Sequence, residues 1–353
     1  MAEIDFARNK SNQIRIIKRK FFKLIGRMFI RIFFRFYLIG KENFPLSGPY
    51  IMAGNHVGSI EALLLVCFAP ELIEVLGAGD IPLDPKLAYF ADLYGYIPIN
   101  RGEIDQNGLK SALGVLEKSG VIGIFPEGGI WDPKIKPAKI GVSWLSQKSN
   151  SPVIPIGFVG IKDALKRSLH FKFPQIQMVV GVPIFPDQFK LGEKSQKENL
   201  TDASNFIMKQ IEALLPETER NAVPFLSENQ AILKIVKVDQ ITGDESIIRF
   251  QNQDSLSYIL QHSIIMDVFL RNLRLPVKPL LLRNKNLSIS ELIIGVQAIL
   301  QYLEDKPGFL PYRFGFEQSA NMKNGLKAFF TFLQENKNGL FSIRFENAYL
   351  ESN

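Results

Sequence analysis

Asn55-His56-Val57-Gly58-Ser59-Ile60-Glu61 is the stretch around which the fold is organised. An apolar run at residues 50–53 precedes it and is typical of a buried strand. A second apolar run, at residues 62–68, follows it and is typical of the start of a buried helix. The stretch is therefore predicted to be a strand-to-helix turn that carries a histidine and a carboxylate.

Four residues separate His56 from Glu61, which is the spacing of an HX4E motif. On a regular helix the two side chains would lie about 140° apart and could not face each other. A bend at Gly58, with Ser59 as the helix N-cap, would place Glu61 in the first helical turn and let its carboxylate turn back toward His56. A carboxylate bonded to one ring nitrogen leaves the other nitrogen available as a general base. Taken alone, such a pair is more often a structural turn histidine beside a solvated glutamate.

Three later stretches each combine an apolar predicted strand with residues suited to a functional turn. They are Gly-Tyr-Ile-Pro-Ile-Asn-Arg-Gly at 95–102, Phe-Pro-Glu-Gly-Gly at 125–129 and Val-Ile-Pro-Ile-Gly at 153–157. Together with the HX4E turn, they resemble the four ordered blocks of the glycerolipid acyltransferase family, which includes 1-acylglycerol-3-phosphate acyltransferase. The resemblance covers roughly residues 35–215, and four blocks in register are a far more specific signal than one.

This resemblance implies an O-acyltransferase that moves a fatty acyl group from acyl-CoA or acyl-carrier protein to a lysophospholipid. The acceptor it implies first is 1-acylglycerol 3-phosphate, with phosphatidic acid as the product, and it implies no metal or nucleotide cofactor. His56 would act as the general base toward the acceptor hydroxyl. Glu61 would orient His56 and stabilise the imidazolium that forms.

The same blocks supply the candidates for substrate binding, which are Asn100, Arg101, Glu127, Gly128, Gly129 and Lys139. The planar fork of Arg101 suits the oxygens of an acceptor phosphate. Glu127 would bind acceptor hydroxyls or orient Arg101, while the two glycines would permit close backbone approach to a ligand or simply form a tight turn. Lys139 is a second cation near the site, and Lys136 competes with it for that role.

Two positions depart from the pattern of the family. The acid of the first block is usually Asp, whereas here it is Glu61, which is one methylene longer. The third block usually continues with Thr and Arg, whereas here Gly129 and Ile130 follow Gly128. Because a possible phosphate contact is lost, a different lysolipid or a glycolipid is the alternative acceptor.

Composition sets the limits on other classes of function. The chain has 353 residues, of which 46% are hydrophobic and 22% charged, so a sizeable core is expected. Cys67 is the single cysteine and cannot form an intramolecular disulfide, which fits a reducing compartment. The three histidines and one cysteine show no metal-ligand spacing, so no metal site is expected.

Basic charge gathers at the N-terminus, where residues 1–41 contain eleven Lys/Arg and two acidic residues. Residues 13–39 have the apolar spacing of a helix and are interleaved with cations. This pattern favours a helix that lies in a membrane interface, so membrane lipids are expected partners, with peripheral attachment at the cytoplasmic face. A helix that caps the catalytic core is the alternative. Nucleic-acid binding is not expected, because large apolar residues recur along the segment.

Beyond Pro49 the chain alternates strands and helices, which predicts an α/β fold with a largely parallel sheet and flanking helices. Strands are expected at 50–54, 74–78, 95–99, 121–125, 153–158 and 176–182, and helices at 60–69, 85–93, 106–119, 138–149 and 201–214. The expected domains are an N-terminal amphipathic helix at 1–40, an acyltransferase domain at 41–216, and a C-terminal α+β region of unrecognised type at 225–353.

The C-terminal region is expected to contain a hairpin (231–238 with 246–250), helices at 255–273, 289–304 and 322–335, and a strand at 340–346. It shows no catalytic constellation. A non-catalytic lipid-binding protein on the same scaffold is the alternative from another class, although the intact His56, Glu61, Arg101 and Glu127 speak against it. An esterase ranks low, because no Gly-x-Ser-x-Gly elbow stands at a strand-to-helix turn.

Overall fold

Two compact units make up the chain. The computed structural model describes residues 2–58, 60–79, 91, 93–101, 105–128, 138–189, 194–220, 231–282, 284–336 and 340–347. Unit 1 comprises residues 1–100 and 105–222, and unit 2 comprises residues 101–104 and 223–353.

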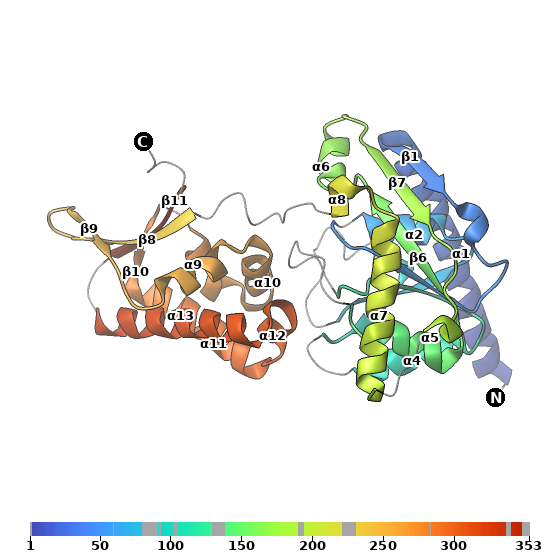
Figure 1. Ribbon diagram of the computed structural model, residues 1–353. Helices are drawn as coiled ribbons and strands as arrows, with labels where there is room; N and C mark the ends of the chain where they lie inside the picture. The colour runs from blue at the N-terminus through green and yellow to red at the C-terminus, as the bar shows by residue number, and fades with distance from the viewer. Residues whose placement is uncertain are drawn as a thin grey trace. The chain divides into compact units, whose positions relative to one another are not determined.

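A seven-stranded sheet forms the centre of unit 1 (Figure 1), in the order β1-β7-β6-β2-β5-β3-β4. Its strands are β1 (Arg35–Ile39), β2 (Tyr50–Gly54), β3 (Ile73–Ala78), β4 (Ile97–Ile99), β5 (Val121–Ile124), β6 (Val153–Val159) and β7 (Gln175–Val180). All neighbouring strands are parallel except β6 and β7. The predicted α/β class with a largely parallel sheet is therefore confirmed.

Helices cover both faces of this sheet (Figure 1). They are α1 (Ala2–Phe33), α2 (Glu61–Phe68), α4 (Gln106–Leu116), α5 (Gly141–Ser149), α6 (Ala164–Leu169), α7 (Gln196–Ala213) and α8 (Glu217–Arg220), with short 3-10 turns η1 (Lys41–Asn43) and η2 (Pro186–Gln188). One apolar core joins α1 and α2 to the sheet, and a second joins α4, α5 and α7 to it. The helix expected at 85–93 lies almost wholly outside the described residues.

The expected helix at 13–39 was wrong at its C-terminal end. Helix α1 ends at Phe33, and residues 35–39 form β1, an edge strand that pairs in parallel with β7. Along β1 the side chains alternate between exposed and half-buried, which is the period of a strand and not of a helix. The hydrogen bonds that β7 offers decide this segment, and β7 begins 140 residues after β1 begins.

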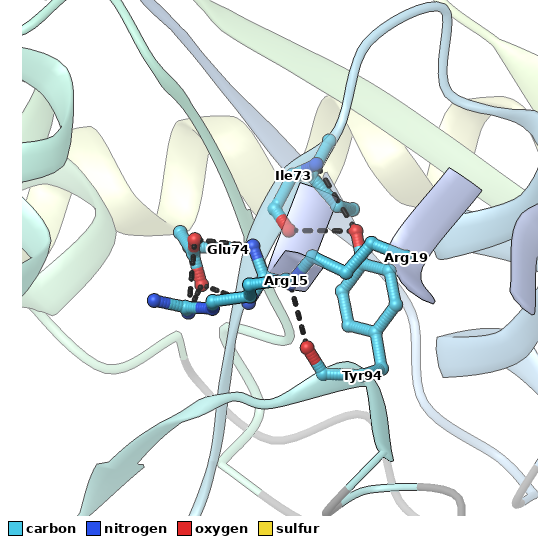
Figure 2. Close-up of polar contacts among 5 residues, drawn as sticks. All are labelled: Arg15, Arg19, Ile73, Glu74 and Tyr94. Atoms are coloured by element: carbon cyan, nitrogen blue, oxygen red, sulfur yellow. Dashed lines mark hydrogen bonds and ion pairs between the residues drawn. The ribbon is translucent and has the colours of Figure 1, made fainter. Parts of the chain in front are cut away.

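Helix α1 is held to unit 1 by its basic side chains (Figure 2). Arg19 forms a bidentate ion pair with Glu74, with nitrogen–oxygen distances of 2.5 and 2.7 Å, and its Nε donates to the carbonyl of Tyr94 at 2.6 Å. Nζ of Lys23 donates to the carbonyls of Ala69 and Glu71, just beyond the C-terminus of α2, at 2.5 and 2.7 Å. Cations are favourable there because the α2 dipole is negative at that end.

One row of apolar side chains on α1 faces outward, while Ile30, Phe22, Phe29 and Phe33 pack on the core. The side chains of the outward row are 45–65% exposed, and they are Ile14, Ile17, Phe21, Leu24, Ile25, Met28 and Ile32. Two basic residues of this helix, Arg19 and Lys23, are instead buried against the protein. Among the described residues, none of the helices combines the length and apolarity needed to cross a membrane.

Unit 2 contains a four-stranded antiparallel sheet in the order β10-β11-β8-β9, with helices packed against it. Its strands are β8 (Ala231–Val238), β9 (Glu245–Ile248), β10 (Asn286–Ser288) and β11 (Leu340–Asn347). Its helices are α9 (Gln253–Gln261), α10 (Ser263–Leu273), α11 (Ile289–Asp305), α12 (Phe309–Phe314) and α13 (Phe316–Glu335), with the 3-10 segment η3 (Leu275–Leu281).

The expected hairpin and final strand of this unit are present. The expected helix at 255–273 is two helices instead of one. His262 has extended backbone angles between α9 and α10, and its Nδ1 accepts the N–H of Ile265 at the start of α10. A side chain that caps a new helix ends the preceding one, so His262 has a structural role here.

Candidate active site

The HX4E turn lies at the carboxyl edge of the sheet, directly after β2. Helix α2 begins at Glu61, and the Glu61 carboxylate turns back to accept the backbone N–H groups of Val57 and Gly58 at 2.6 and 2.5 Å. The same oxygen lies 3.6 Å from Nδ1 of His56. The structure therefore shows the predicted geometry, in which Glu61 occupies the first helical turn and His56 stays outside it. The expectation that Ser59 is the N-cap was wrong, because the residue that precedes α2 as its N-cap is Ile60, which makes no side-chain capping bond.

The Glu61 carboxyl is buried, but its surroundings favour its charged form. Its side chain has no exposed surface, and burial acts to raise the pKa of this carboxyl. Proximity to His56 and backbone N–H donors outweigh burial, so the pKa of Glu61 is lowered overall. The distance of 3.6 Å between Glu61 Oε1 and His56 Nδ1 is longer than a hydrogen bond, and catalytic contacts of this kind tighten when substrate binds. The arrangement can therefore direct Nδ1–H of His56 to Glu61 and leave Nε2 as the base.

The third block lies beside His56 on the neighbouring strand. A turn follows β5, closed by a bond of 3.0 Å from Gly128 N–H to the Phe125 carbonyl, and Gly128 has a φ of 76°, which favours glycine. In this turn, Oε1 of Glu127 accepts the backbone N–H of His56 at 3.0 Å. Glu127 thus fixes the main chain that carries the proposed base. The sequence did not indicate this contact.

Burial raises the pKa of Glu127 to about 7, although the bond from the His56 N–H and the charge of His56 act in the opposite direction. The native state then binds more protons than the unfolded chain between about pH 4.5 and 7, so stability falls as pH rises through that window. We expect Glu127→Gln to be more stable than the wild type at pH 8, by roughly 2–3 kcal/mol, with a smaller difference at pH 5. The glutamine keeps an oxygen for the His56 N–H and cannot ionise.

Chemical denaturation of both proteins from pH 5 to pH 8 measures this difference. Glu42→Gln, which removes an exposed carboxylate of the same unit, is the matched control and should leave the pH dependence of stability unchanged. A Glu127→Gln variant whose stability follows the wild type at every pH would contradict the assignment.

Two further residues position the site and carried no assigned role in the sequence analysis. The side chain of Asn55 spans β2 and β6, donating to the carbonyl of Phe158 at 3.1 Å and accepting its N–H at 2.7 Å. The ring of Phe125 stacks on the imidazole of His56, with centroids 4.3 Å apart. Their closeness in sequence to residues with a predicted role could have indicated them, since Asn55 precedes His56 and Phe125 lies two residues before Glu127.

The remaining candidates lie farther from His56 or are not placed with it. Asn100 follows β4, which is three strand positions from β2, so about 14 Å separates the two strands. The backbone N–H of Asn100 donates to Asp105 at 2.9 Å. Arg101 follows it but groups with unit 2, so its position relative to His56 stays a prediction. Gly129 and Lys136 lie outside the described residues.

Lys139 lies next to the third block. Its backbone N–H donates to the carbonyl of Pro126 at 2.9 Å, which brings the start of α5 against the turn that carries Glu127. Burial lowers the pKa of its ammonium group. In the part of the chain that the structure describes, no cluster of His, Cys, Asp and Glu side chains has the arrangement of a metal site.

The largely parallel sheet with His56 beside Glu61 at its carboxyl edge is the arrangement expected of an acyltransferase. Comparison with known proteins supports this class. A family model described as Acyltransferase matches residues 35–159. Over these residues the chain is similar to the acyltransferase family, which supports the resemblance to glycerolipid O-acyltransferases found in the sequence.

Three named relatives illustrate the similarity. A 1-acyl-sn-glycerol-3-phosphate acyltransferase of Bacillus subtilis is 23% identical over 179 residues, covering 50% of this chain and 88% of the relative. The enzyme of that name from Borreliella burgdorferi is 25% identical over 182 residues, covering 50% and 71%. A crystal structure of a 1-acyl-sn-glycerophosphate acyltransferase from Thermotoga maritima aligns with a TM-score of 0.41 and 16% identity, covering 57% of this chain and 83% of that chain.

Proposed function

We propose that this protein transfers a fatty acyl group from acyl-CoA or acyl-carrier protein to 1-acylglycerol 3-phosphate, with phosphatidic acid as the product. The observation that carries the proposal is the His56 imidazole beside the buried Glu61 carboxyl, whose pKa is lowered by His56 and by backbone N–H donors, at the carboxyl edge of the sheet. In open α/β sheets, ligands bind at this edge. The names of the relatives support the choice of acceptor.

In this mechanism, His56 takes the proton of the acceptor hydroxyl as its oxygen attacks the acyl carbonyl of the thioester. The new C–O bond forms, the C–S bond breaks, and the leaving thiolate receives the proton from the imidazolium. Glu61 stabilises that imidazolium and holds the ring in its reactive tautomer. Glu127 positions the His56 backbone and, when protonated, can donate a hydrogen bond to an acceptor oxygen. No acyl-enzyme is required.

Helix α1 supports attachment of the enzyme to a membrane surface. Its exposed apolar stripe consists of large side chains, while two of its cations are engaged by the protein itself. An apolar helix face of this kind binds in the boundary between head groups and acyl chains. We infer peripheral attachment to the membrane that contains the lipid acceptor.

Acceptors without phosphate form the second candidate class. The position after Gly128 and Gly129 is Ile130, where the family pattern has a cation. Arg101 is then the main candidate for binding the acceptor phosphate, and the acceptor can be another lysolipid or a glycolipid if Arg101 does not do so.

An acceptor panel distinguishes the two candidates. Labelled acyl-CoA and acyl-carrier protein are each offered 1-acylglycerol 3-phosphate and its dephosphorylated analogue. We expect transfer to the phosphorylated acceptor only, and we expect Arg101→Ala to raise KM for that acceptor at least about tenfold because a charge-assisted contact is lost. Arg249→Ala, at an exposed arginine, is the control. Equal transfer to both acceptors, or an unchanged KM, would reject the phosphate site.

A further inference from the structure

The segment that joins β6 to β7, residues 160–174, lies at the catalytic edge of unit 1. Strand β7 is antiparallel to β6, and β1 is parallel to β7. The amino ends of β1 and β7 therefore lie at the edge where β2, β5 and β6 have their carboxyl ends. That edge also carries His56 and Glu127, directly after β2 and β5.

Three large apolar side chains of this segment point into solvent. Leu169, Phe171 and Phe173 are 64%, 70% and 43% exposed. Phe171 and Phe173 also have left-handed backbones, with φ of 55° and 43°. Such conformations are unfavourable for bulky side chains and are held only where the surroundings determine them. Packing within unit 1 does not bury the two rings, so their arrangement calls for an external apolar partner.

Hydrogen bonds of the backbone hold the segment in this shape. The N–H groups of Phe171 and Lys172 donate to the carbonyls of Ser168 and Arg167 at 2.9 and 3.1 Å. The carbonyl of Pro174 accepts the N–H of Arg35 at 3.1 Å, which fastens the segment to the start of β1. The exposed rings are therefore presented by a defined turn.

The charges around the rings are suited to an anionic partner. The segment has one exposed carboxylate, Asp163, and four exposed cationic side chains, which are Lys162, Lys166, Arg167 and Lys172. Aromatic side chains flanked by Lys and Arg are typical of segments that insert into the interface of an anionic bilayer. The ring of Phe171 also contacts that of Phe33 at the end of α1, with centroids 6.3 Å apart.

We propose that residues 169–173 form a second membrane-insertion element, distinct from α1, which places Phe171 and Phe173 in the interface of an anionic phospholipid bilayer beside the catalytic edge. The acceptor lipid would then reach His56 from the bilayer without passing through water. This step rests on the proposed function, whereas the insertion itself does not.

Site-specific labelling tests the insertion in the full chain. Cys67 is fully buried, and burial raises the pKa of its thiol to about 12, so an introduced exposed cysteine reacts selectively. An environment-sensitive fluorophore is attached to Phe171→Cys and, as the control, to Leu46→Cys. Leu46 is fully exposed and precedes β2, at the opposite edge of the sheet.

With vesicles of phosphatidylglycerol and phosphatidylcholine, we expect a blue-shifted, at least twofold stronger emission from the label at position 171 and no change at position 46. Pure phosphatidylcholine should give a weaker response at position 171. An unchanged emission at position 171, while the protein sediments with the vesicles, would overturn the proposal in favour of a protein partner for this surface.

The double variant Phe171→Asn/Phe173→Asn gives a second, independent readout, because asparagine tolerates left-handed backbones and should preserve the turn. We expect its partition coefficient on anionic vesicles to fall at least about tenfold. The ratio of acyl transfer to vesicle-embedded acceptor over sub-micellar acceptor should fall in parallel. Weakened vesicle binding without transfer to any acceptor in the wild type would support the insertion and reject the proposed function. Unchanged vesicle binding by the double variant would overturn the insertion.

Discussion

Replacing His56 with alanine is expected to lower kcat for acyl transfer at least about a hundredfold, which is the scale of a lost general base. The fold should survive, because the imidazole is partly exposed and makes a ring contact with Phe125, whereas the hydrogen bond from His56 to Glu127 uses the backbone N–H. The buried Glu61 keeps its bonds to Val57 and Gly58 in the variant.

Single-turnover measurement of transfer from labelled acyl-CoA tests this expectation, with the melting temperature as the control for folding. Phe125→Leu provides a matched comparison, because it removes the ring that stacks on His56 and leaves the base itself in place. That variant should lose much less activity. A His56→Ala enzyme that transfers within about threefold of the wild-type rate would remove His56 from the mechanism.

Replacing Arg19 with methionine is expected to destabilise unit 1 by about 3 kcal/mol, the lower end of the range for breaking a buried ion pair. The substitution leaves the Glu74 carboxylate, whose side chain is 20% exposed, without its bidentate partner, and it removes the bond to the Tyr94 carbonyl (Figure 2). Methionine preserves much of the volume of the stem, so the loss reports polar contacts more than packing.

Denaturant unfolding in the absence of lipid measures this loss. Lys20→Met is the control, since Lys20 is the exposed neighbour of Arg19 on the same helix. The double variant Arg19→Met/Glu74→Gln should be less destabilised than the sum of the two single variants, because the buried bidentate pair is lost only once and the remaining contact of Glu74, with the exposed Arg15, is weak. If Arg19→Met unfolds at the same denaturant concentration as Lys20→Met, the polar contacts of Arg19 do not hold α1 in place.

The way α1 is attached bears directly on its proposed role at the membrane. In a surface helix the apolar stripe ordinarily faces the protein core. Here the face of α1 that packs on unit 1 combines apolar side chains such as Ile30 with the buried cations Arg19 and Lys23, which bond to Glu74 and to the carbonyls at the end of α2. A second row of large apolar side chains is exposed, and both α1 and the turn at 169–173 can offer apolar side chains to lipid.

The spacing of apolar and polar residues within short stretches predicted much of the secondary structure and the geometry of the HX4E turn. The apolar runs flanking the HX4E turn predicted β2 and α2, and the four-residue spacing with Gly58 predicted that Glu61 would turn back to His56, as observed. The helix expected at 289–304 likewise begins as α11 where the Ser288 side chain accepts the N–H of Glu291. These features depend on contacts between residues that are close in the chain, so they can be predicted from the local sequence pattern.

Only the tertiary structure decided which face of α1 is buried, that residues 35–39 form a strand, and that β7 reverses direction. A helical period identifies two stripes but not the partner of either one, and here the partners of Arg19 are Glu74 and Tyr94, 55 and 75 residues away. In the same way, the bond from His56 to Glu127 joins residues 71 apart and exists because β2 and β5 are neighbours in the sheet. Local sequence sets which groups can bond, and the pairing of distant strands and helices determines which of them meet.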